Sequence, residues 1–174
     1  MRIVFVTPVY WPYKAGMAHV VLEEARGLVG RGHEVHVVTQ RRGEAAHEVR
    51  DGVQIHRYGA WIWYDKSGWI PCMNRRVYAL APDVIHLHLP CFGVQELTWW
   101  RKRVPLVATY HMDIAQGEFV GFVARISRLF FVPHLWKRLD RLFVSSLDYA
   151  RGSWLMDVWS DVESRVIEAP FGVD

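Results

Sequence analysis

The sequence predicts an α/β fold with a doubly wound, mostly parallel sheet of about seven strands. Two observations lead to this prediction. Short apolar runs rich in β-branched residues recur along the whole chain, and segments with helical periodicity separate them. A length of 174 residues is enough for one domain with a sizeable core. We find no internal repeat, low-complexity tract or interdomain linker.

The first 39 residues have the order strand, loop, helix, strand. RIVFV at 2–6 is a buried-strand run that ends at Thr7-Pro8. From Ala18 the apolar residues lie on one helical face, at positions 18, 21, 22, 25, 28 and 29, and Gly30-Arg31-Gly32 ends it. HEVHVVT at 33–39 is the next strand. Such a unit joins two parallel strands through a crossover helix.

The later elements continue this alternation. We expect strands at 53–58, 83–89, 105–111, 140–146 and 164–170, and helices at 92–103 and 147–160. A long amphipathic stretch runs to about Leu139 and is interrupted at Pro133. We interpret 40–52 as a charged loop and 60–75, which contains three Trp, as irregular.

Composition narrows the possible functions. A net charge of +3 with Lys and Arg spread along the chain gives little support for nucleic-acid binding, and no nucleic-acid partner is expected. Cys72 and Cys91 lack metal-ligand spacing and are interpreted as reduced thiols. No apolar run has the length of a signal sequence or a membrane span. A cytoplasmic protein is therefore expected.

Two segments raise the question of contact with a membrane surface. The nine Trp indicate either aromatic packing in the core or a surface that meets sugars or lipid headgroups. The stretch 119–139 contains four cationic residues and no acidic one. It either lies on an anionic membrane or covers the core with solvated Arg side chains. Peripheral contact with the inner face of the cell membrane is thus one expectation.

The loop after the first strand is a candidate phosphate site, because ligands of open α/β sheets bind at the carboxyl ends of the strands. In TPVYWPYKAGMAHV, Gly16 comes just before the first helical face. A glycine there lets backbone N–H groups approach a phosphate at a helix N-terminus, and Lys14 would add a charge. The alternative is a turn glycine without a ligand. The loop is neither GxGxxG nor a P-loop, which disfavours NAD enzymes and NTPases.

The strand ending in PLVATY is followed by a second candidate site. His111 and Asp113 come directly after it, where an imidazole can donate to a sugar hydroxyl and a carboxylate can accept from one or act as a base. The alternative is a His that caps a helix or bonds to backbone. His86 and His88 share one face of their strand, and without a third ligand at suitable spacing we interpret them as structural or pocket-lining residues.

Taken in order, these pieces resemble the family-4 glycosyltransferases, which are retaining enzymes of the GT-B fold. MRIVFVTPVYWPYKAGMAHVVLEEARGLVGRGHEVHVVT is similar to the opening of that family, and APDVIHLHLP to its x-P-D-V-I-H-x-H. VPLVATYHMDI resembles a form common in mannosyltransferase-like members that build surface polysaccharides. DRLFVSSLDYARGSWLM and the closing VIEAPFGVD match two further motifs.

The resemblance implies that residues 1–174 are a Rossmann-like N-terminal, acceptor-side domain. The C-terminal domain, which in this family holds most of the nucleotide-sugar donor, would be absent from this chain, so the chain alone is expected to be inactive. The implied reaction transfers a sugar from a GDP- or UDP-linked donor to a sugar or lipid-linked acceptor, in polysaccharide or glycolipid synthesis. No cofactor and no obligatory metal are implied.

The resemblance also implies roles for single residues. His111 would face the transferred sugar as a catalytic residue together with Asp113, and Gly16 would bring its N–H to the donor diphosphate beside Lys14. Ala15 stands where the family has a first glycine. The expected acceptor or pocket residues are Tyr10, Met17, Tyr110, Ser145 and Tyr149. For Ser145, Ser146 and Tyr149 the alternative is capping of the next helix.

Two other functional classes remain open from the sequence. One is a complete, non-catalytic α/β module that binds a sugar, a nucleotide or a partner protein. The other is a membrane-surface protein that uses residues 60–75 and 119–139. The second is compatible with the enzyme, because many polysaccharide acceptors are linked to lipids.

Overall fold

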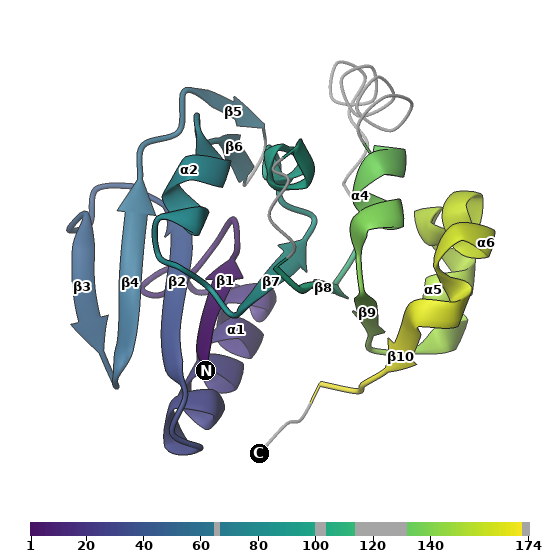
Figure 1. Cartoon of the computed structure of the whole chain (residues 1–174), viewed down its shortest axis with the longest axis horizontal. Coiled ribbons are helices and arrows are strands. Elements are labelled where there is room, and N and C mark those ends of the chain that lie inside the picture. The colour runs from purple at the N-terminus through teal and green to yellow at the C-terminus, as the bar shows by residue number, and fades with distance from the viewer. Residues whose placement is uncertain (65–66, 100–103, 114–131, 172–174) are drawn as a thin grey trace.

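The chain forms one eight-stranded sheet in a computed structural model that describes residues 1–64, 67–99, 104–113 and 132–171 (Figure 1). The strand order is β10-β9-β8-β7-β1-β2-β4-β3, and every neighbouring pair except β3 and β4 is parallel. The predicted α/β class with a mostly parallel sheet is confirmed. No helix within the described ranges is long and apolar enough to cross a membrane.

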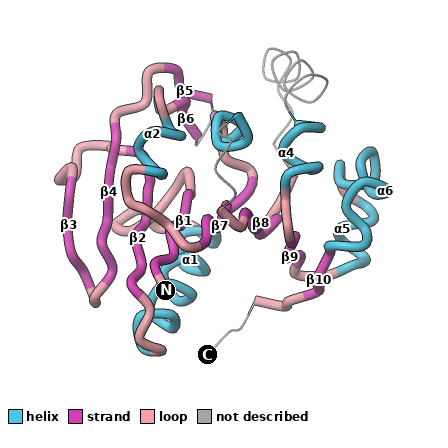
Figure 2. Tube along the Cα trace, viewed as in Figure 1, coloured by secondary structure: helices cyan, strands magenta, loops and turns pink. Residues whose placement is uncertain are grey.

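The elements alternate along the chain as Figure 2 shows. The strands are β1 Arg2–Val6, β2 Glu34–Gln40, β3 His47–Arg50, β4 Val53–Tyr58, β5 Ile62–Tyr64, β6 Ser67–Trp69, β7 Val84–Leu89, β8 Leu106–Tyr110, β9 Arg141–Val144 and β10 Val166–Glu168. The α-helices are α1 Gly16–Gly30, α2 Met73–Tyr78, α4 Val132–Arg138, α5 Leu147–Gly152 and α6 Trp159–Val162. The described residues also form the 3-10 helices η1 Val94–Trp99, η2 Trp154–Val158 and η3 Glu163–Arg165.

Two hydrophobic clusters cover the two faces of the sheet, because successive strand residues point to opposite sides. On β1, Val4 and Val6 belong to the larger cluster, whereas Ile3 and Phe5 belong to the smaller one beneath α1. The strand is nearly fully buried, which explains its continuous apolar sequence. Strand β1 lies between β2 and β7, so the chain changes direction across the sheet at this position. Ligands of such sheets bind outside this switch point.

Two segments predicted to be irregular contain strands. Strand β3 lies within the charged loop 40–52 and pairs antiparallel with β4 at the edge of the sheet. Its sequence HEVR alternates between exposed and half-exposed residues, so it lacks the apolar run that marks the central strands. In 60–75, β5 and β6 form a separate antiparallel hairpin. Gln40 donates to the carbonyl of Gly68 there, which joins the hairpin to the main sheet.

Three predicted helices differ from the structure in their described parts. Within 92–103, the described residues form only the turn η1, and 100–103 lie outside the described ranges. The helix expected at 147–160 is divided into α5, η2 and the start of α6, because Ser153 adopts an extended conformation and caps η2. The helical face expected from Ala18 begins two residues earlier, at Gly16.

Of the cationic stretch 119–139, residues 119–131 lie outside the described ranges. The remainder contains α4, whose Leu135 and Trp136 are buried in the larger cluster, as is the following Leu139. These three residues cover the core, and for 119–131 the choice between a membrane-surface helix and a core-covering helix stays a prediction. Cys72 and Cys91 are both free thiols, as expected.

Candidate functional site at the carboxyl ends of the strands

The N-terminus of α1 is an uncapped helix end beside the carboxyl end of β1. Ala15 precedes the helix in extended conformation and provides no side-chain cap, and the first turn contains no acidic residue. The first intrahelical bond is donated by His19 to the Ala15 carbonyl, so the N–H groups of the preceding turn point out of the helix. Gly16 is exposed, and a Cβ on it would meet no atom within 4 Å. This end of α1 can accept an anion.

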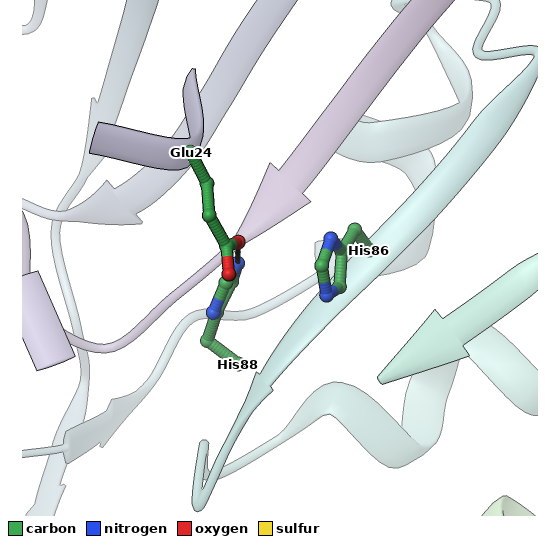
Figure 3. A group of neighbouring side chains, drawn as sticks. All are labelled: Glu24, His86 and His88. Carbon is green, nitrogen blue, oxygen red and sulfur yellow. Dashed lines mark ion pairs between the residues drawn. The ribbon is translucent and has the colours of Figure 1, made fainter. Parts of the chain in front are cut away.

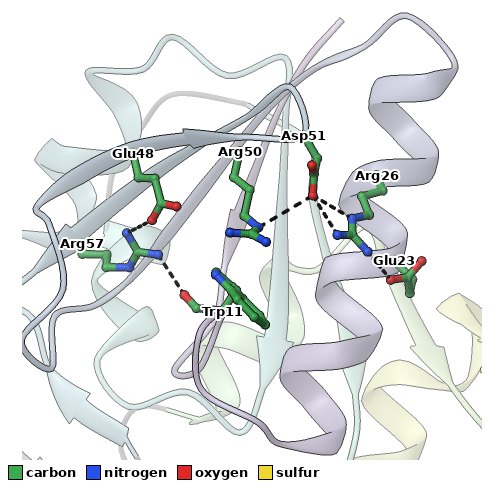
Figure 4. A network of polar contacts seen from close by, with 7 residues as sticks. All are labelled: Trp11, Glu23, Arg26, Glu48, Arg50, Asp51 and Arg57. Carbon is green, nitrogen blue, oxygen red and sulfur yellow. Dashed lines mark hydrogen bonds and ion pairs between the residues drawn. The ribbon is translucent and has the colours of Figure 1, made fainter.

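A buried arginine anchors the loop that leads to this helix end (Figure 4). Arg57 on β4 has a side chain that is only 1% exposed, and it pairs with Glu48 of β3 at 2.9 Å. Its other terminal nitrogen donates to the Trp11 carbonyl at 2.8 Å. Arg50 lies over the Trp11 ring, 4.4 Å from its centre. The 7–15 loop is therefore fixed to the edge of the sheet by charge-assisted contacts.

Two cations lie near the same loop. The Lys14 side chain is exposed two residues before the helix begins, as expected for a residue that meets an anion. The guanidinium of Arg42 lies 5.0 Å from the centre of the Tyr13 ring and 4.8 Å from that of Trp63. The sequence reasoning did not single out Arg42, because its position depends on the fold rather than on any local pattern.

Polar side chains lie on the α1-facing side of the sheet, on β7 and at the end of its neighbour β8. His86 and His88 stack on each other with ring centres 4.5 Å apart, and Phe5 contacts both by its edge. His86 Nε2 lies 2.8 Å from the Thr109 hydroxyl, and His88 Nδ1 lies 3.0 Å from Nε2 of His111. Four of these side chains, the three histidines and Thr109, come from the motif VIHLHLP and its neighbour ATYH, and they form one polar row.

His111 lies where β8 ends, at the exposed end of that row. Its backbone N–H donates to the Leu89 carbonyl, and Phe171 stacks on its ring with centres 4.9 Å apart. Burial lowers the pKa of His111 to about 4. The imidazole is neutral near pH 7, so one ring nitrogen donates and the other accepts a hydrogen bond.

Glu24 of α1 adds a carboxyl group to the histidine row (Figure 3). Its Oε2 lies 3.7 Å from Nε2 of His88, and among the described residues neither atom has a hydrogen-bond partner. Burial raises the pKa of Glu24 to about 7 and lowers that of His88 well below its usual value. The argument that no third ligand approaches His86 and His88 is thus wrong, because their ligand atoms and one of Glu24 lie within 4.8 Å of one another.

The ring geometry does not favour a metal ion at this cluster. The planes of His86 and His88 are stacked at 27°, and an imidazole lone pair lies in the plane of its ring. Turning either ring toward a common ion would disturb its hydrogen bond to Thr109 or to His111. The absence of a metal cofactor remains a prediction.

Asp113 acts mainly as a connector. One carboxylate oxygen, Oδ1, accepts from the Tyr110 hydroxyl and, at 3.1 Å, from the backbone N–H of Trp154. The Asp113 N–H donates to the hydroxyl of Tyr149. The loop after β8 is thereby tied to α5 and η2. Burial and the Asp113 hydrogen bond raise the pKa of Tyr110.

The expected pocket residues lie in two different environments. Tyr10 and Met17 are 4% and 7% exposed and pack in the cluster beneath α1, and Tyr110 is buried in the larger cluster. Tyr149 is 43% exposed. Ser146 caps α5 by accepting from the Tyr149 N–H, which confirms the capping alternative for this serine. The half-buried Ser145 precedes it at the end of β9. Acceptor contacts by these residues stay predictions.

Around the histidine row, sequence reasoning missed two further residues, Glu24 and Phe171. Glu24 lies beside the apolar face of α1 and not within it, so helical periodicity assigns it to solvent. Phe171 belongs to the closing motif APFGVD, but only the pairing of β10 beside β9 brings it to His111.

Comparisons with known proteins identify the family and the fold. A family model described as Glycosyltransferase Family 4 matches residues 15–151. The fold is similar to an alpha-glucosyltransferase in complex with UDP-glucose and DNA containing an abasic site, with a TM-score of 0.59 and 17% identity over 100% of this chain and 43% of that one. It is also similar to the catalytic domain of starch synthase IV from Arabidopsis thaliana bound to ADP and acarbose, with a TM-score of 0.59 and 12% identity over 99% and 52%.

A third similar structure is the glycotransferase of kitacinnamycin, with a TM-score of 0.53 and 15% identity over 99% of this chain and 52% of that one. The chain thus spans about half, or less, of the length of these proteins. At these identities the likeness concerns the fold. No curated protein sequence matches the chain.

Proposed function

Because the chain belongs to glycosyltransferase family 4, we propose that it forms the acceptor-side half of a retaining enzyme that transfers a sugar from a nucleotide-sugar donor. The match over residues 15–151 supports sugar transfer in general. The uncapped end of α1, which follows β1, and the neutral imidazole of His111, which follows β8, support the more specific chemistry, because these strands are parallel and their carboxyl ends lie at one edge of the sheet. This juxtaposition is the observation on which the proposal depends.

In the proposed reaction, the α1 end stabilises charge that develops on the leaving diphosphate. The N–H groups at Gly16 and the exposed Lys14 would meet the phosphates, as Ala15 leaves the helix end open. His111 would face the transferred sugar and hydrogen-bond to it, and Asp113 would hold the loop that carries His111. Such electrostatic stabilisation is usually a large part of catalysis.

The second half-site would come from a donor-binding domain outside residues 1–174. Closure of two half-sites excludes water and aligns the reactants, so the chain alone is proposed to be inactive. The donor is proposed to be UDP- or GDP-linked. The acceptor is a sugar or a lipid-linked sugar in surface polysaccharide or glycolipid synthesis, a proposal that rests on the TYHMD resemblance. The proposed location is the cytoplasm.

The proposal is tested by nucleotide binding to the 15N-labelled chain, followed by NMR. Addition of UDP, GDP or ADP should shift the amides of Gly16, Met17 and Ala18. Gly16→Asp should weaken this binding at least about tenfold, because a carboxylate repels phosphate at the same helix end. The same substitution should leave the fold intact or slightly more stable, since an acidic residue suits a helix N-terminus and a Cβ at Gly16 meets no atom.

Gly27→Asp is the matched control, because Gly27 is an exposed glycine on the same helix with open space around a Cβ. It makes the same change in charge away from the proposed site and should bind nucleotide like the original chain. Shifts that map to another surface, or equal binding by Gly16→Asp, would refute the phosphate site.

An exposed aromatic hairpin supports peripheral membrane contact as an addition to this function. Trp61, Ile62 and Trp63 are 75%, 57% and 46% exposed, and Arg42 lies over the Trp63 ring. Trp side chains with nearby cations suit the headgroup region of an anionic bilayer. Flotation with anionic vesicles should recover the chain at low salt, and Trp61→Ser with Trp63→Ser should reduce recovery. Equal recovery of both proteins would exclude the hairpin as the contact.

A further inference from the structure

Three titratable side chains form a continuous row from α1 to the end of β8. Glu24 Oε2 lies 3.7 Å from His88 Nε2, and His88 Nδ1 lies 3.0 Å from His111 Nε2. His88 is therefore the only link in this row between the carboxyl group and the imidazole at the strand end. Each of its two ring nitrogens faces a different partner.

The middle imidazole is held in place from several sides. His88 is 0% exposed, stacks on His86 and meets the edge of the Phe5 ring. Its Nε2 and the Oε2 of Glu24 are buried atoms that have no hydrogen-bond partner among the described residues. Leaving two buried polar groups unpaired is costly, and a small rotation of the flexible Glu24 side chain would join them.

A neutral imidazole has one donor and one acceptor nitrogen, so the row permits two proton arrangements. A protonated Glu24 donates to Nε2 of His88, whose proton then lies on Nδ1 and is donated to Nε2 of His111. The proton of His111 then lies on Nδ1. If Glu24 is ionised, both imidazoles carry their proton on Nε2, and Nδ1 of His111 becomes an acceptor.

We propose that Glu24 is a positioning residue that determines, through His88, which nitrogen of His111 carries the proton. Passing from the first arrangement to the second moves the Glu24 proton to His88 Nε2 and the His88 Nδ1 proton to His111 Nε2. One proton leaves from Nδ1 of His111, so three protons become two and the row carries one negative charge on Glu24. The buried carboxyl group thus converts the outer nitrogen of His111 between donor and acceptor.

Within the part of the chain that the structure describes, few other titratable groups face the row. His86 on β7 stacks on His88 and is bonded to Thr109, and burial lowers its pKa to about 3. The strand residues that pack beneath α1 are apolar: Ile3 and Phe5 on β1, Val35 and Val37 on β2, and Val53 and Ile55 on β4. On α1 itself, the neighbouring Glu23 is paired with Arg26 at 2.9 Å. The carboxyl group of Glu24 is thus the acidic group that faces His88.

The test uses histidine labelled with 15N in the 174-residue chain, with the His111 signals assigned from His111→Phe. Long-range proton–nitrogen correlations report which ring nitrogen is protonated. At pH 5.5 His111 should carry its proton on Nδ1, and at pH 8.5 on Nε2, with the tautomer ratio changing at least about tenfold. Glu24→Leu and the isosteric Glu24→Gln should abolish this change.

Glu23→Gln is the matched control, because it neutralises the adjacent carboxyl group, which faces solvent. In this variant the His111 tautomer should change between pH 5.5 and pH 8.5 as it does in the original chain. Two different replacements, Glu24→Leu and Glu24→Gln, are used so that an effect on the His111 tautomer can be told from unfolding. Circular dichroism would detect unfolding in either variant. An unchanged His111 tautomer between the two pH values, or the same change in Glu24→Leu, would overturn the proposal. Tight Zn²⁺ binding that Glu24→Leu abolishes would also overturn it.

The role of His111 in sugar transfer rests on the proposed function, whereas the effect of Glu24 on the His111 tautomer does not. The tautomer readout needs no donor, acceptor or second domain. A failed tautomer test would leave the phosphate site at Gly16 untouched, and a failed nucleotide test would leave the proton arrangement standing.

Discussion

Asp113 shows how one side chain in a predicted catalytic position can serve the scaffold. Its Oδ1 accepts from Tyr110 and from the Trp154 N–H, so it joins the end of β8 to η2. A carboxylate oxygen that already accepts two hydrogen bonds from the protein is less suited to accept a proton from a substrate. Its contribution to the proposed enzyme is to hold the loop beside His111.

Replacement of Asp113 should therefore lower stability. Asp113→Ala removes the acceptor of two hydrogen bonds and should reduce the free energy of unfolding by about 1–3 kcal/mol. Asp113→Asn keeps a carbonyl oxygen at that position and should lose roughly half as much. Urea denaturation of the three proteins measures both values. Equal stability of all three would show that the carboxylate is free for chemistry.

The residues that could be foreseen are those whose position alone is informative. Gly16 and His111 follow the ends of strands, and that rule places them at one edge of the sheet. Glu24 could not be foreseen, because its significance depends on the side chain of a residue on a different element. Periodicity predicts which face of α1 is apolar. It does not predict that His88 lies close to Glu24, next to that face.

At the scale of elements, the contact that matters most lies between β4 and the first loop. Arg57 satisfies the Trp11 carbonyl and pairs with Glu48 while its own side chain is buried. It joins β3, β4 and the 7–15 loop with one guanidinium. Because the 7–15 loop leads into α1, the contacts of Arg57 also help to position the N-terminus of α1.

Arg57→Met should loosen the loop as well as lower stability. The substitution keeps the buried stem but leaves Glu48 and the Trp11 carbonyl without their partner, at a cost of about 2–5 kcal/mol. Hydrogen exchange of the amides in 7–15 should accelerate. Arg26→Met is the control, since its pairs with Glu23 and Asp51 are exposed and are worth about 1 kcal/mol or less. Equal effects of the two substitutions would contradict the anchoring role.

The strands of the main sheet other than β3 were predicted, whereas β3 and the β5–β6 hairpin were not. The central strands are buried on both faces, so their composition alone identifies them. Strand β3 and the β5–β6 hairpin lie at edges, where one side or both meet solvent and the apolar pattern is lost. The subdivision at Ser153 depends on a side-chain cap that a helical pattern does not reveal.

At the scale of the whole molecule, the two clusters share strands β1 and β2. β1 contributes to each face, and β7 carries apolar residues on one face and histidines on the other. A domain built this way is expected to unfold as one unit. Protonation of a few side chains should therefore change the stability of the whole domain.

Acid should destabilise the domain through its buried histidines. Burial lowers the pKa of His56 and His111 to about 4 and that of His86 to about 3, and it lowers the pKa of His88 further below its usual value. The unfolded chain binds these protons near pH 6.5, so their contribution is complete above that pH and is lost as pH falls toward 4. The loss is at most about 1.4 kcal/mol per pH unit for each histidine.

Urea denaturation between pH 7 and pH 4.5 measures this loss. His86→Leu should flatten the dependence, whereas His19→Gln should keep it, because the His19 side chain is exposed. Glu24 acts with the opposite sign: its pKa is raised to about 7, so its contribution is present below pH 4.5 and is lost as pH rises through 7. A dependence that is unchanged in His86→Leu would argue against the buried histidines as its source.

The stacking of Phe171 on His111 has a mechanical consequence. Phe171 comes three residues after the end of β10, where the backbone leaves the sheet, and its ring centre lies 4.9 Å from that of the imidazole. A force that bends the backbone at this exit is transmitted by ring contact to the imidazole, with no intervening flexible side chain. A displacement of the backbone after β10 would therefore move the Phe171 ring and, through it, the His111 ring at the end of β8.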